Sequence, residues 1–134
     1  MIGRNAYGPG LGEARVQWIG PVREGMATDD VDKLIDSGRL TLVEIDRLAV
    51  PRKTLAHRRI LGRLTLEQSD RLLRILRMIE DAEYTFGDPA KAHAWLRRPS
   101  ALLDNEAPLD RLDTDPGSRQ VEALLGRIAH GLAA

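Results

Sequence analysis

The fold is decided by the stretch that runs from Thr65 to Gly87, TLEQSDRLLRILRMIEDAEYTFG. Gln68 follows Thr65 by three residues, the spacing of a capping box, in which each side chain accepts a hydrogen bond from the backbone amide of the other residue. Apolar residues then recur at intervals of three and four, as one face of an α-helix requires; they are Leu72, Ile75, Leu76, Ile79, Ala82 and Phe86. Gly87 ends the pattern. The stretch therefore predicts a long helix.

Short helices with explicit start and stop signals are predicted after this long helix. Asp88 and Pro89 supply an N-cap and a first-turn proline, and Pro99 halts the helix that they begin. A loop follows, and Pro108 and Pro116 mark the starts of two further helices. The last of these carries a continuous apolar face, formed by Val121, Leu124, Leu125, Ile128 and Leu132. This part of the chain predicts a compact helical module.

Upstream of the long helix, the sequence predicts two short helices with polar caps. Thr28 or Asp29 can cap the first, which ends near Gly38. Thr41 can cap the second, and Glu44 stands three residues later as the partner of a capping box. No strand and no internal repeat are recognisable, so the fold is predicted to be all-α.

A third upstream helix is predicted from Pro51, at the position where proline favours a helix start. Leu55, Ile60 and Leu61 are predicted to face inward from it. This helix and the one that begins at Thr41 are joined by a tight connection. Two short helices so joined make a helix-turn-helix arrangement.

The expected organisation has four parts. An N-terminal arm spans residues 1–27, the helix-turn-helix domain 28–64, the connecting helix 65–87 and the C-terminal module 88–134. The arm is rich in glycine and proline, and Val16, Trp18 and Ile19 within it can form a short strand-like patch. The arm is therefore expected to be extended or loosely docked.

Composition favours a small soluble protein. The apolar fraction of 43% suffices for a core, and the aromatic fraction of 4% means that aliphatic side chains fill it. Cysteine is absent, which excludes disulfides and thiolate metal sites. No apolar run approaches the roughly 20 residues that span a bilayer, and no signal peptide is visible. These features predict a cytoplasmic protein without membrane attachment.

The zero net charge conceals a basic middle, because no acidic residue occurs between Pro51 and Arg63. In a helix-turn-helix the second helix lies in the major groove of DNA, and residues near its N-terminus contact base edges. The residues predicted to contact DNA are Arg52, Lys53, Thr54 and His57 at the bases, and Arg58 and Arg59 at the phosphates. The alternative is a solvated basic face.

Catalysis is not indicated. His57, His93 and His130 lie on separate predicted helices and form no metal-ligand pair. No glycine-rich phosphate loop follows a strand, and nothing orients a base toward Ser100. No catalytic residue, metal or cofactor is expected.

The C-terminal motifs resemble the toxin-binding domain of the Xre/MbcA/ParS antitoxins. The motifs are Trp95-Leu96, Pro99, Leu103, Pro108-Leu109-Asp110, Leu112, Gly117, Val121-Glu122, Leu124-Leu125-Gly126-Arg127-Ile128 and His130-Gly131. In that family a joining segment connects this domain to an Xre-like helix-turn-helix. Three stretches of the present sequence resemble the joining segment: Arg63-Leu64, Ser69-Asp70-Arg71-Leu72-Leu73-Arg74 and Phe86-Gly87-Asp88-Pro89. The resemblance covers roughly Val31 to Gly131.

The resemblance implies a type II antitoxin. Such a protein neutralises a RES-domain toxin, an enzyme that consumes NAD, by covering its active site, and it represses its own operon by binding operator DNA. A homodimer within a hetero-oligomeric toxin–antitoxin complex is expected. The toxin-binding residues implied are Trp95, Arg97, Arg98, Leu102, Leu103, Arg127, His130 and Gly131. Arg127 and His130 are three residues apart and so share one helix face. The alternative for Trp95 and the leucines is a place in the core.

A second interpretation is a plain helix-turn-helix transcription regulator whose C-terminal half only dimerises. The predicted turn, Ala49-Val50-Pro51, departs from the usual pattern because it contains no glycine. A dimer or a toxin complex is therefore expected to supply further DNA contacts, since one small basic helix offers few. From Ser100 onward acidic residues outnumber basic ones, and the two interpretations differ in what this acidic C-terminal end binds.

Overall fold

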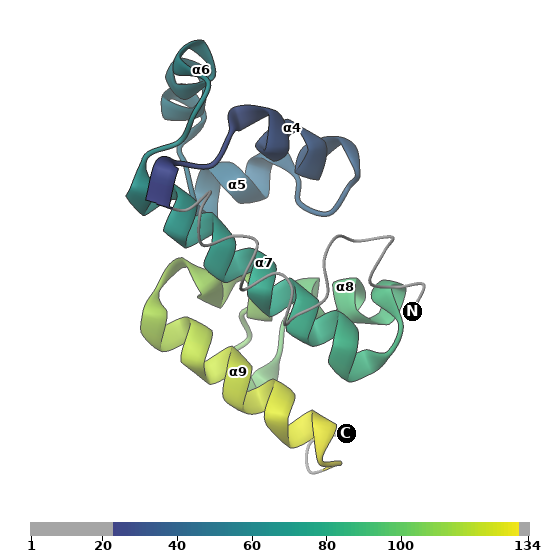
Figure 1. Ribbon diagram of the computed structural model, residues 1–134. Coiled ribbons are helices and arrows are strands. Elements are labelled where there is room, and N and C mark those ends of the chain that lie inside the picture. The colour runs from purple at the N-terminus through teal and green to yellow at the C-terminus, as the bar shows by residue number, and fades with distance from the viewer. Residues whose placement is uncertain (1–22, 132–134) are drawn as a thin grey trace. The chain divides into compact units, whose positions relative to one another are not determined.

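The protein is described here by a computed structural model, which defines residues 23–131 (Figure 1). Within this range the chain forms α-helices and 3₁₀-helices, with two isolated bridges and no β-strand. This confirms the predicted all-α fold. The patch expected around Trp18 lies outside the described residues. No helix in the range combines the length and the apolar character needed to cross a bilayer.

The chain divides into two compact units, with the boundary between Leu73 and Arg74. The N-terminal unit contains α4 (Thr28–Asp36), α5 (Leu42–Leu48), α6 (Arg52–Leu61) and the first turns of α7 (Leu66–Phe86). Its core is aliphatic; the most deeply buried side chains are Met26, Val31, Leu40, Ile45, Leu55, Leu64 and Leu72. A helix-turn-helix formed by α5 and α6 is thus seated on a small hydrophobic core.

Both predicted capping boxes are present. Thr41 Oγ1 accepts from the amide of Glu44 at 3.1 Å, and Glu44 Oε1 accepts from the amide of Thr41 at 3.0 Å. Thr65 Oγ1 accepts from the amide of Gln68 at 3.1 Å, and Gln68 Oε1 accepts from the amide of Thr65 at 2.9 Å. These reciprocal bonds satisfy amides that the first turn of a helix leaves unpaired, so they fix where α5 and α7 begin.

The start of α4 differs from the prediction. The N-cap is Ala27, without a side-chain hydrogen bond, so the predicted capping by Thr28 or Asp29 is wrong. The amide of Thr28 instead donates to the carbonyl oxygen of Gly62 at 3.0 Å, and Ala27 forms a bridge with Arg63. A backbone carbonyl from a distant part of the chain therefore replaces the side-chain cap.

The inward face predicted for α6 is also wrong in part. Leu55 is fully buried, but Ile60 is 82% exposed and Leu61 57% exposed. Residues three, four or seven apart share a helix face, whereas Ile60 and Leu61 follow Leu55 by five and six residues. Their side chains therefore point well away from the face that Leu55 buries, and α6 is held to its unit through one deeply buried position.

The C-terminal unit contains the rest of α7, then α8 (Pro89–Arg97), η1 (Ala101–Leu103), η2 (Pro108–Asp113) and α9 (Asp115–Ala129). Both α8 and α9 pack against η2, which makes this short 3₁₀-helix the centre of the unit. The side chains buried there include Leu96, Leu103, Leu109, Leu112, Val121, Leu124 and Leu125. Ile128 is partly exposed, and Leu132 lies outside the described residues.

Local caps set the ends of these helices. Asp88 Oδ1 accepts from the amide of Ala90 at 3.0 Å, which confirms the predicted start of α8. The N-cap of α9 is Thr114, whose Oγ1 accepts from the amide of Gly117 at 3.1 Å. Gly117 itself is buried where α9 meets η2, and a Cβ there would collide with the carbonyl oxygen of Arg111. The close approach of α9 to η2 therefore requires glycine at this position.

Candidate functional site

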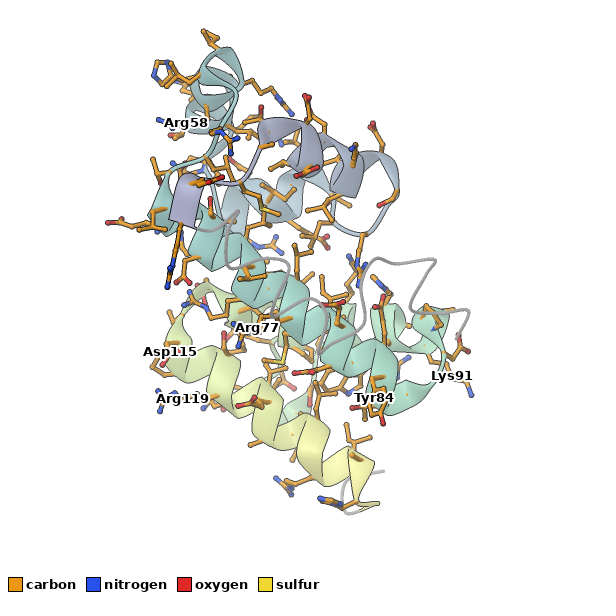
Figure 2. The ribbon with its side chains drawn as sticks, viewed as in Figure 1. Arg58, Arg77, Tyr84, Lys91, Asp115 and Arg119 are labelled. Atoms are coloured by element: carbon orange, nitrogen blue, oxygen red, sulfur yellow. The ribbon has the colours of Figure 1, made fainter. Side chains whose placement is uncertain are left out.

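The first candidate surface is the basic helix α6 of the N-terminal unit (Figure 2). Arg52, Lys53 and His57 are exposed on it, and Thr54 is partly buried. The amide of Arg52 donates to Oδ1 of Asp46, which lies on α5. This carboxylate occupies the positive end of the α6 helix dipole, so it fixes the start of α6 relative to α5.

Both residues predicted to contact phosphates already have partners within the unit. Arg58 Nε donates to the carbonyl oxygen of Arg63 at 2.7 Å, and Arg59 Nη2 forms an ion pair with Asp32 Oδ1 at 2.8 Å. Both pairs are accessible to solvent, where such a contact contributes little to stability and exchanges readily. The basic side chains of α6 that have neither an ion pair nor a hydrogen bond with a residue in the described range therefore lie in its N-terminal half, at Arg52 and Lys53.

The second candidate surface begins with a closed loop in the C-terminal unit, the 100–106 loop. The amide of Ser100 donates to the carbonyl oxygen of Glu106 at 3.0 Å, and the amide of Asn105 donates to the carbonyl oxygen of Ser100 at 2.8 Å. Asp104 and Asn105 turn the chain in the left-handed region, with φ of 55° and 64°. The loop displays Leu102, which is 62% exposed, while it buries the neighbouring Leu103.

Arg111 ties this loop to α9. Its Nη2 donates to the carbonyl oxygen of Leu103 at 2.8 Å and to Asp104 Oδ2 at 3.0 Å. Its Nη1 donates to Gln120 Oε1 at 2.9 Å, and its Nε lies 2.9 Å from Glu106 Oε1 in an ion pair that lacks hydrogen-bond geometry. One guanidinium group thus contacts two carboxylates, a backbone carbonyl and the side chain of Gln120 on α9. The planar, fixed arrangement of its N–H groups allows it to reach several acceptors at once.

The loop and α9 border a hollow of about 210 Å³, lined by Leu102, Leu103, Gln120, Ala123, Leu124 and Arg127. Three residues predicted to contact a toxin therefore meet here, although Arg127 is distant in sequence from the two leucines. Arg127 is exposed and forms no ion pair with another residue in the described part of the chain.

Other predicted contacts lie away from this hollow. Trp95 is partly buried and packs against Phe86, with ring centroids 5.5 Å apart and planes inclined by 47°. Arg98 is exposed at the C-cap of α8. His130 is the exposed C-cap of α9, and Gly131 follows it with a φ of 74°. They share the C-terminal unit with the hollow but are not part of its lining.

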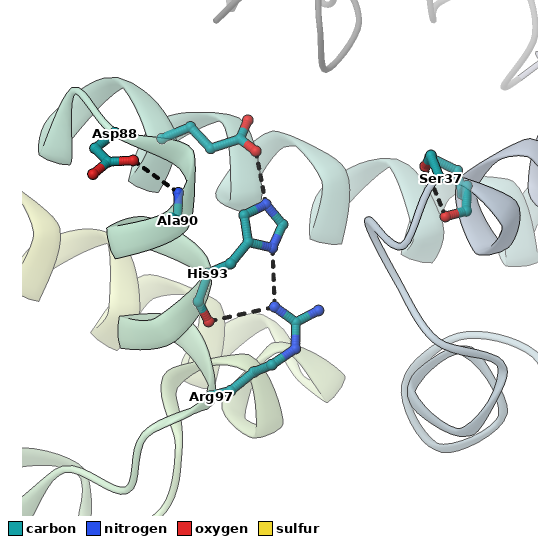
Figure 3. A network of polar contacts seen from close by, with 7 residues as sticks. Ser37, Asp88, Ala90, His93 and Arg97 are labelled. Carbon is teal, nitrogen blue, oxygen red and sulfur yellow. Dashed lines mark hydrogen bonds and ion pairs between the residues drawn. The ribbon is translucent and has the colours of Figure 1, made fainter.

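Arg97 takes part in a polar network with His93 and Glu83 (Figure 3). Arg97 Nη1 lies 3.0 Å from His93 Nδ1, and His93 Nε2 lies 2.8 Å from Glu83 Oε2. Because an arginine only donates, Nδ1 must accept and Nε2 must carry the proton that it donates to the carboxylate. The network links α8 to α7 and gives Arg97 a structural role beside any contact with a partner.

Arg111 and Gln120 belong to this candidate surface, although the sequence prediction did not include them. The sequence places Asp104 and Glu106 upstream of Arg111, but only the fold shows that both carboxylates and Gln120 converge on its guanidinium group. Short segments that mix acidic and basic residues are common in proteins, so this charge pattern alone does not predict that the side chains converge on Arg111.

Comparison with known proteins matches both units to described families. Residues 17–77 match the antitoxin Xre-like helix-turn-helix domain, and residues 81–131 match the antitoxin Xre/MbcA/ParS C-terminal toxin-binding domain. Antitoxin Xre of Pseudomonas putida is 37% identical over 111 residues, which cover 82% of this chain and 69% of that protein. The chain belongs to the Xre antitoxin family. The matched family models describe an antitoxin that carries a helix-turn-helix domain and a toxin-binding domain.

Further relatives agree with this assignment. Antitoxin Xre of Yersinia enterocolitica is 32% identical, over 85% of this chain and 79% of that protein. Antitoxin Xre of Photorhabdus laumondii is 33% identical, over 83% of this chain and 77% of that protein. In this antitoxin the helix-turn-helix match contains α5 and α6, and the toxin-binding match contains α8, η1, η2 and α9. The two domains imply DNA and a toxin as partners.

Proposed function

We propose that the chain is the antitoxin of a type II toxin–antitoxin system, that it neutralises a RES-domain toxin that consumes NAD by covering the active site, and that it represses its own operon. The observation that carries the toxin contact is the meeting of Leu102 and Arg127 at one hollow of the toxin-binding domain. Leu102 is an exposed apolar side chain on a fixed loop, and Arg127 beside it has no ion pair with any residue in the range 23–131; together they have the chemistry of an interface anchor.

The test of this proposal is co-expression of the full chain with the toxin encoded beside it. We expect the two proteins to co-purify in a fixed ratio, and the NAD-consuming activity of the toxin to be suppressed in the complex. Release of the antitoxin by denaturation, followed by refolding of the toxin, should restore NAD consumption. A chain that binds operator DNA and self-associates, but neither binds nor inhibits the toxin, would favour a plain transcription regulator.

The DNA contact is proposed for the N-terminal half of α6. Arg52 and Lys53 are exposed there, and the carboxylate of Asp46 fixes the backbone from which they extend. One short helix supplies few contacts, and helix-turn-helix proteins commonly add contacts by binding two half-sites as a dimer. We therefore propose a homodimer within the toxin–antitoxin complex as the DNA-binding form.

Replacing Arg52 and Lys53 together by alanine should weaken operator binding and its dependence on salt. Each lost phosphate contact reduces the magnitude of the slope of log K against log salt concentration by about 0.9, so the reduction should be about 1.8 per copy if both residues meet phosphates. Fluorescence anisotropy across a salt series measures both quantities. A smaller slope change with a loss of sequence preference would place one of the residues at a base edge.

The matched control is the pair Arg77→Ala and Lys91→Ala. Both side chains are exposed in the C-terminal unit, and the pair removes the same two positive charges (Figure 2). Operator binding should change little in this control. An equal loss in both double variants would mean that net charge, and not the α6 surface, controls DNA binding.

A further inference from the structure

We propose that the hollow between the 100–106 loop and α9 receives one apolar side chain of the toxin, next to a toxin carboxylate, and that Arg111 is the positioning residue for the rim of this hollow. The inference deepens the proposed function and rests on it for the identity of the partner. It assigns a role to Arg111, Gln120 and Ala123, which the sequence comparison does not distinguish from the rest of the domain.

The size of the hollow favours a single side chain. Its volume is about 210 Å³. Pockets for small molecules and cofactors typically have about 300–1,000 Å³. A protruding aliphatic or aromatic side chain fills a smaller space. The hollow thus fits an anchor residue better than a free metabolite.

The lining specifies the chemistry of the occupant. Leu102, Leu103, Ala123 and Leu124 provide apolar walls, which favour an apolar side chain. Arg127 lies at the same hollow, without an ion pair to any residue that the structure describes. An acidic group of the partner beside the apolar anchor would satisfy this guanidinium group with charge-assisted hydrogen bonds.

A toxin fits this surface better than a second copy of the antitoxin. All lining residues fall within residues 81–131, the match to the toxin-binding domain. The rim also carries exposed carboxylates, since the side chain of Asp104 is 93% exposed and that of Glu106 53% exposed. Both carboxylates are paired with Arg111, so the charged group that this surface offers to a partner at the hollow is the guanidinium group of Arg127.

Arg111 determines how Leu102 is presented. It holds the carbonyl oxygen of Leu103 on one side and Gln120, which lines the hollow, on the other. The wall made by the loop and the wall made by α9 therefore share one guanidinium group. A rim that is rigid before binding loses less conformational freedom when the partner docks, which increases affinity without adding a contact.

The first experiment fills the hollow. Ala123→Leu adds three carbons to an exposed position of α9 that lines it, so the full-length variant should fold and yet exclude the toxin side chain. We expect the dissociation constant of the toxin complex, measured by surface plasmon resonance, to rise about 30-fold or more, the size of an interface hot spot. Ala90→Leu, the same change at an exposed position of α8, should alter it less than about twofold.

The second experiment tests whether Arg111 acts through the loop. Arg111→Lys keeps the charge but loses the fork of donors. We expect it to weaken toxin binding about 10-fold in the wild-type background and to have little effect in a Leu102→Ala background, because coupled residues give non-additive changes. A purely structural Arg111 would weaken binding equally in both backgrounds. The melting temperatures of the wild type, the two single variants and the double variant show that each protein is folded at the temperature of the assay.

The outcomes separate this inference from the proposed function. If the wild-type chain binds the toxin and Ala123→Leu binds it as well as Ala90→Leu does, the occupant of the hollow is wrong while toxin binding stands. If Ala123→Leu abolishes self-association and leaves toxin binding unchanged, the occupant is a second copy and the proposal is overturned. A wild-type chain that fails to bind the toxin overturns both proposals.

Discussion

Gly117→Ala is expected to lower the free energy of unfolding by about 2 kcal/mol, within the usual range for overpacking a well-packed site. The new methyl group would collide with the carbonyl oxygen of Arg111 and come within 3.0 Å of Thr114 Oγ1, the N-cap of α9. The clash can be relieved only if α9 moves away from η2, because the clashing oxygen belongs to the backbone of η2 and cannot rotate aside as a side chain can. The clash outweighs the gain of about 1 kcal/mol that alanine has over glycine inside a helix.

The same helix supplies the control for this prediction. A Cβ at Gly126 would meet no atom within 4 Å. Gly126→Ala should therefore raise the free energy of unfolding by about 0.5–1 kcal/mol, because alanine loses less backbone entropy in a helix. Urea unfolding followed by circular dichroism compares the two variants. If Gly117→Ala were as stable as Gly126→Ala, the close contact between α9 and η2 would be wrong.

Toxin binding should also respond to Gly117→Ala and not to Gly126→Ala. The carbonyl group that the new methyl displaces belongs to Arg111, whose side chain holds the 100–106 loop. A shift of η2 would carry Arg111 away from Leu103 and Gln120. We expect the affinity for the toxin to fall even at a temperature where the variant is fully folded.

Leu55→Ala is expected to lower the free energy of unfolding of the N-terminal unit by about 2–5 kcal/mol, the range for removing a large aliphatic side chain from a core. Leu55 is fully buried and is the one α6 residue that the structure describes as buried. Without it, α6 retains the cap from Asp46 and solvent-exposed polar contacts. Operator binding should then fall steeply, although the charge of the chain is unchanged.

Ile60→Ala is the matched control because it truncates an aliphatic residue of the same helix at a position that is 82% exposed. Such surface changes usually alter stability by less than about 0.5 kcal/mol. Thermal unfolding and anisotropy with operator DNA measure both variants. A large destabilisation by Ile60→Ala would instead support the inward position that the sequence predicted for Ile60.

Features encoded within a few residues were predicted correctly. Thr41 with Glu44 and Thr65 with Gln68 each carry their partner three residues away, so the cap is complete within one helical turn. Asp88 likewise caps α8 through the amide of Ala90. Local chemistry of this kind does not depend on the rest of the fold, and the all-α class followed from it.

Features that depend on distant residues were not predictable from the sequence. The start of α4 is set by the carbonyl group of Gly62, so Thr28 needs no side-chain cap. Leu102 and Arg127 line the same hollow because the fold places the 100–106 loop beside α9. Arg111, which lies on η2, binds the loop through the carbonyl oxygen of Leu103. Pro51 indicated where α6 begins, but the exposure of Ile60 depended on which face of the helix packs against the core.

Hydrogen bonds between residues 26–28 and 62–64 hold together the two ends of the segment that contains α4, α5 and α6. The amide of Leu64 donates to the carbonyl oxygen of Met26 at 2.8 Å, and the amide of Met26 donates to Ser69 Oγ at 2.7 Å. A segment whose ends are adjacent can be exchanged as a cassette without changing the separation of the residues that flank it. We expect that replacing this closed segment would change the DNA contact proposed for α6 and leave Arg111 and the hollow as they are.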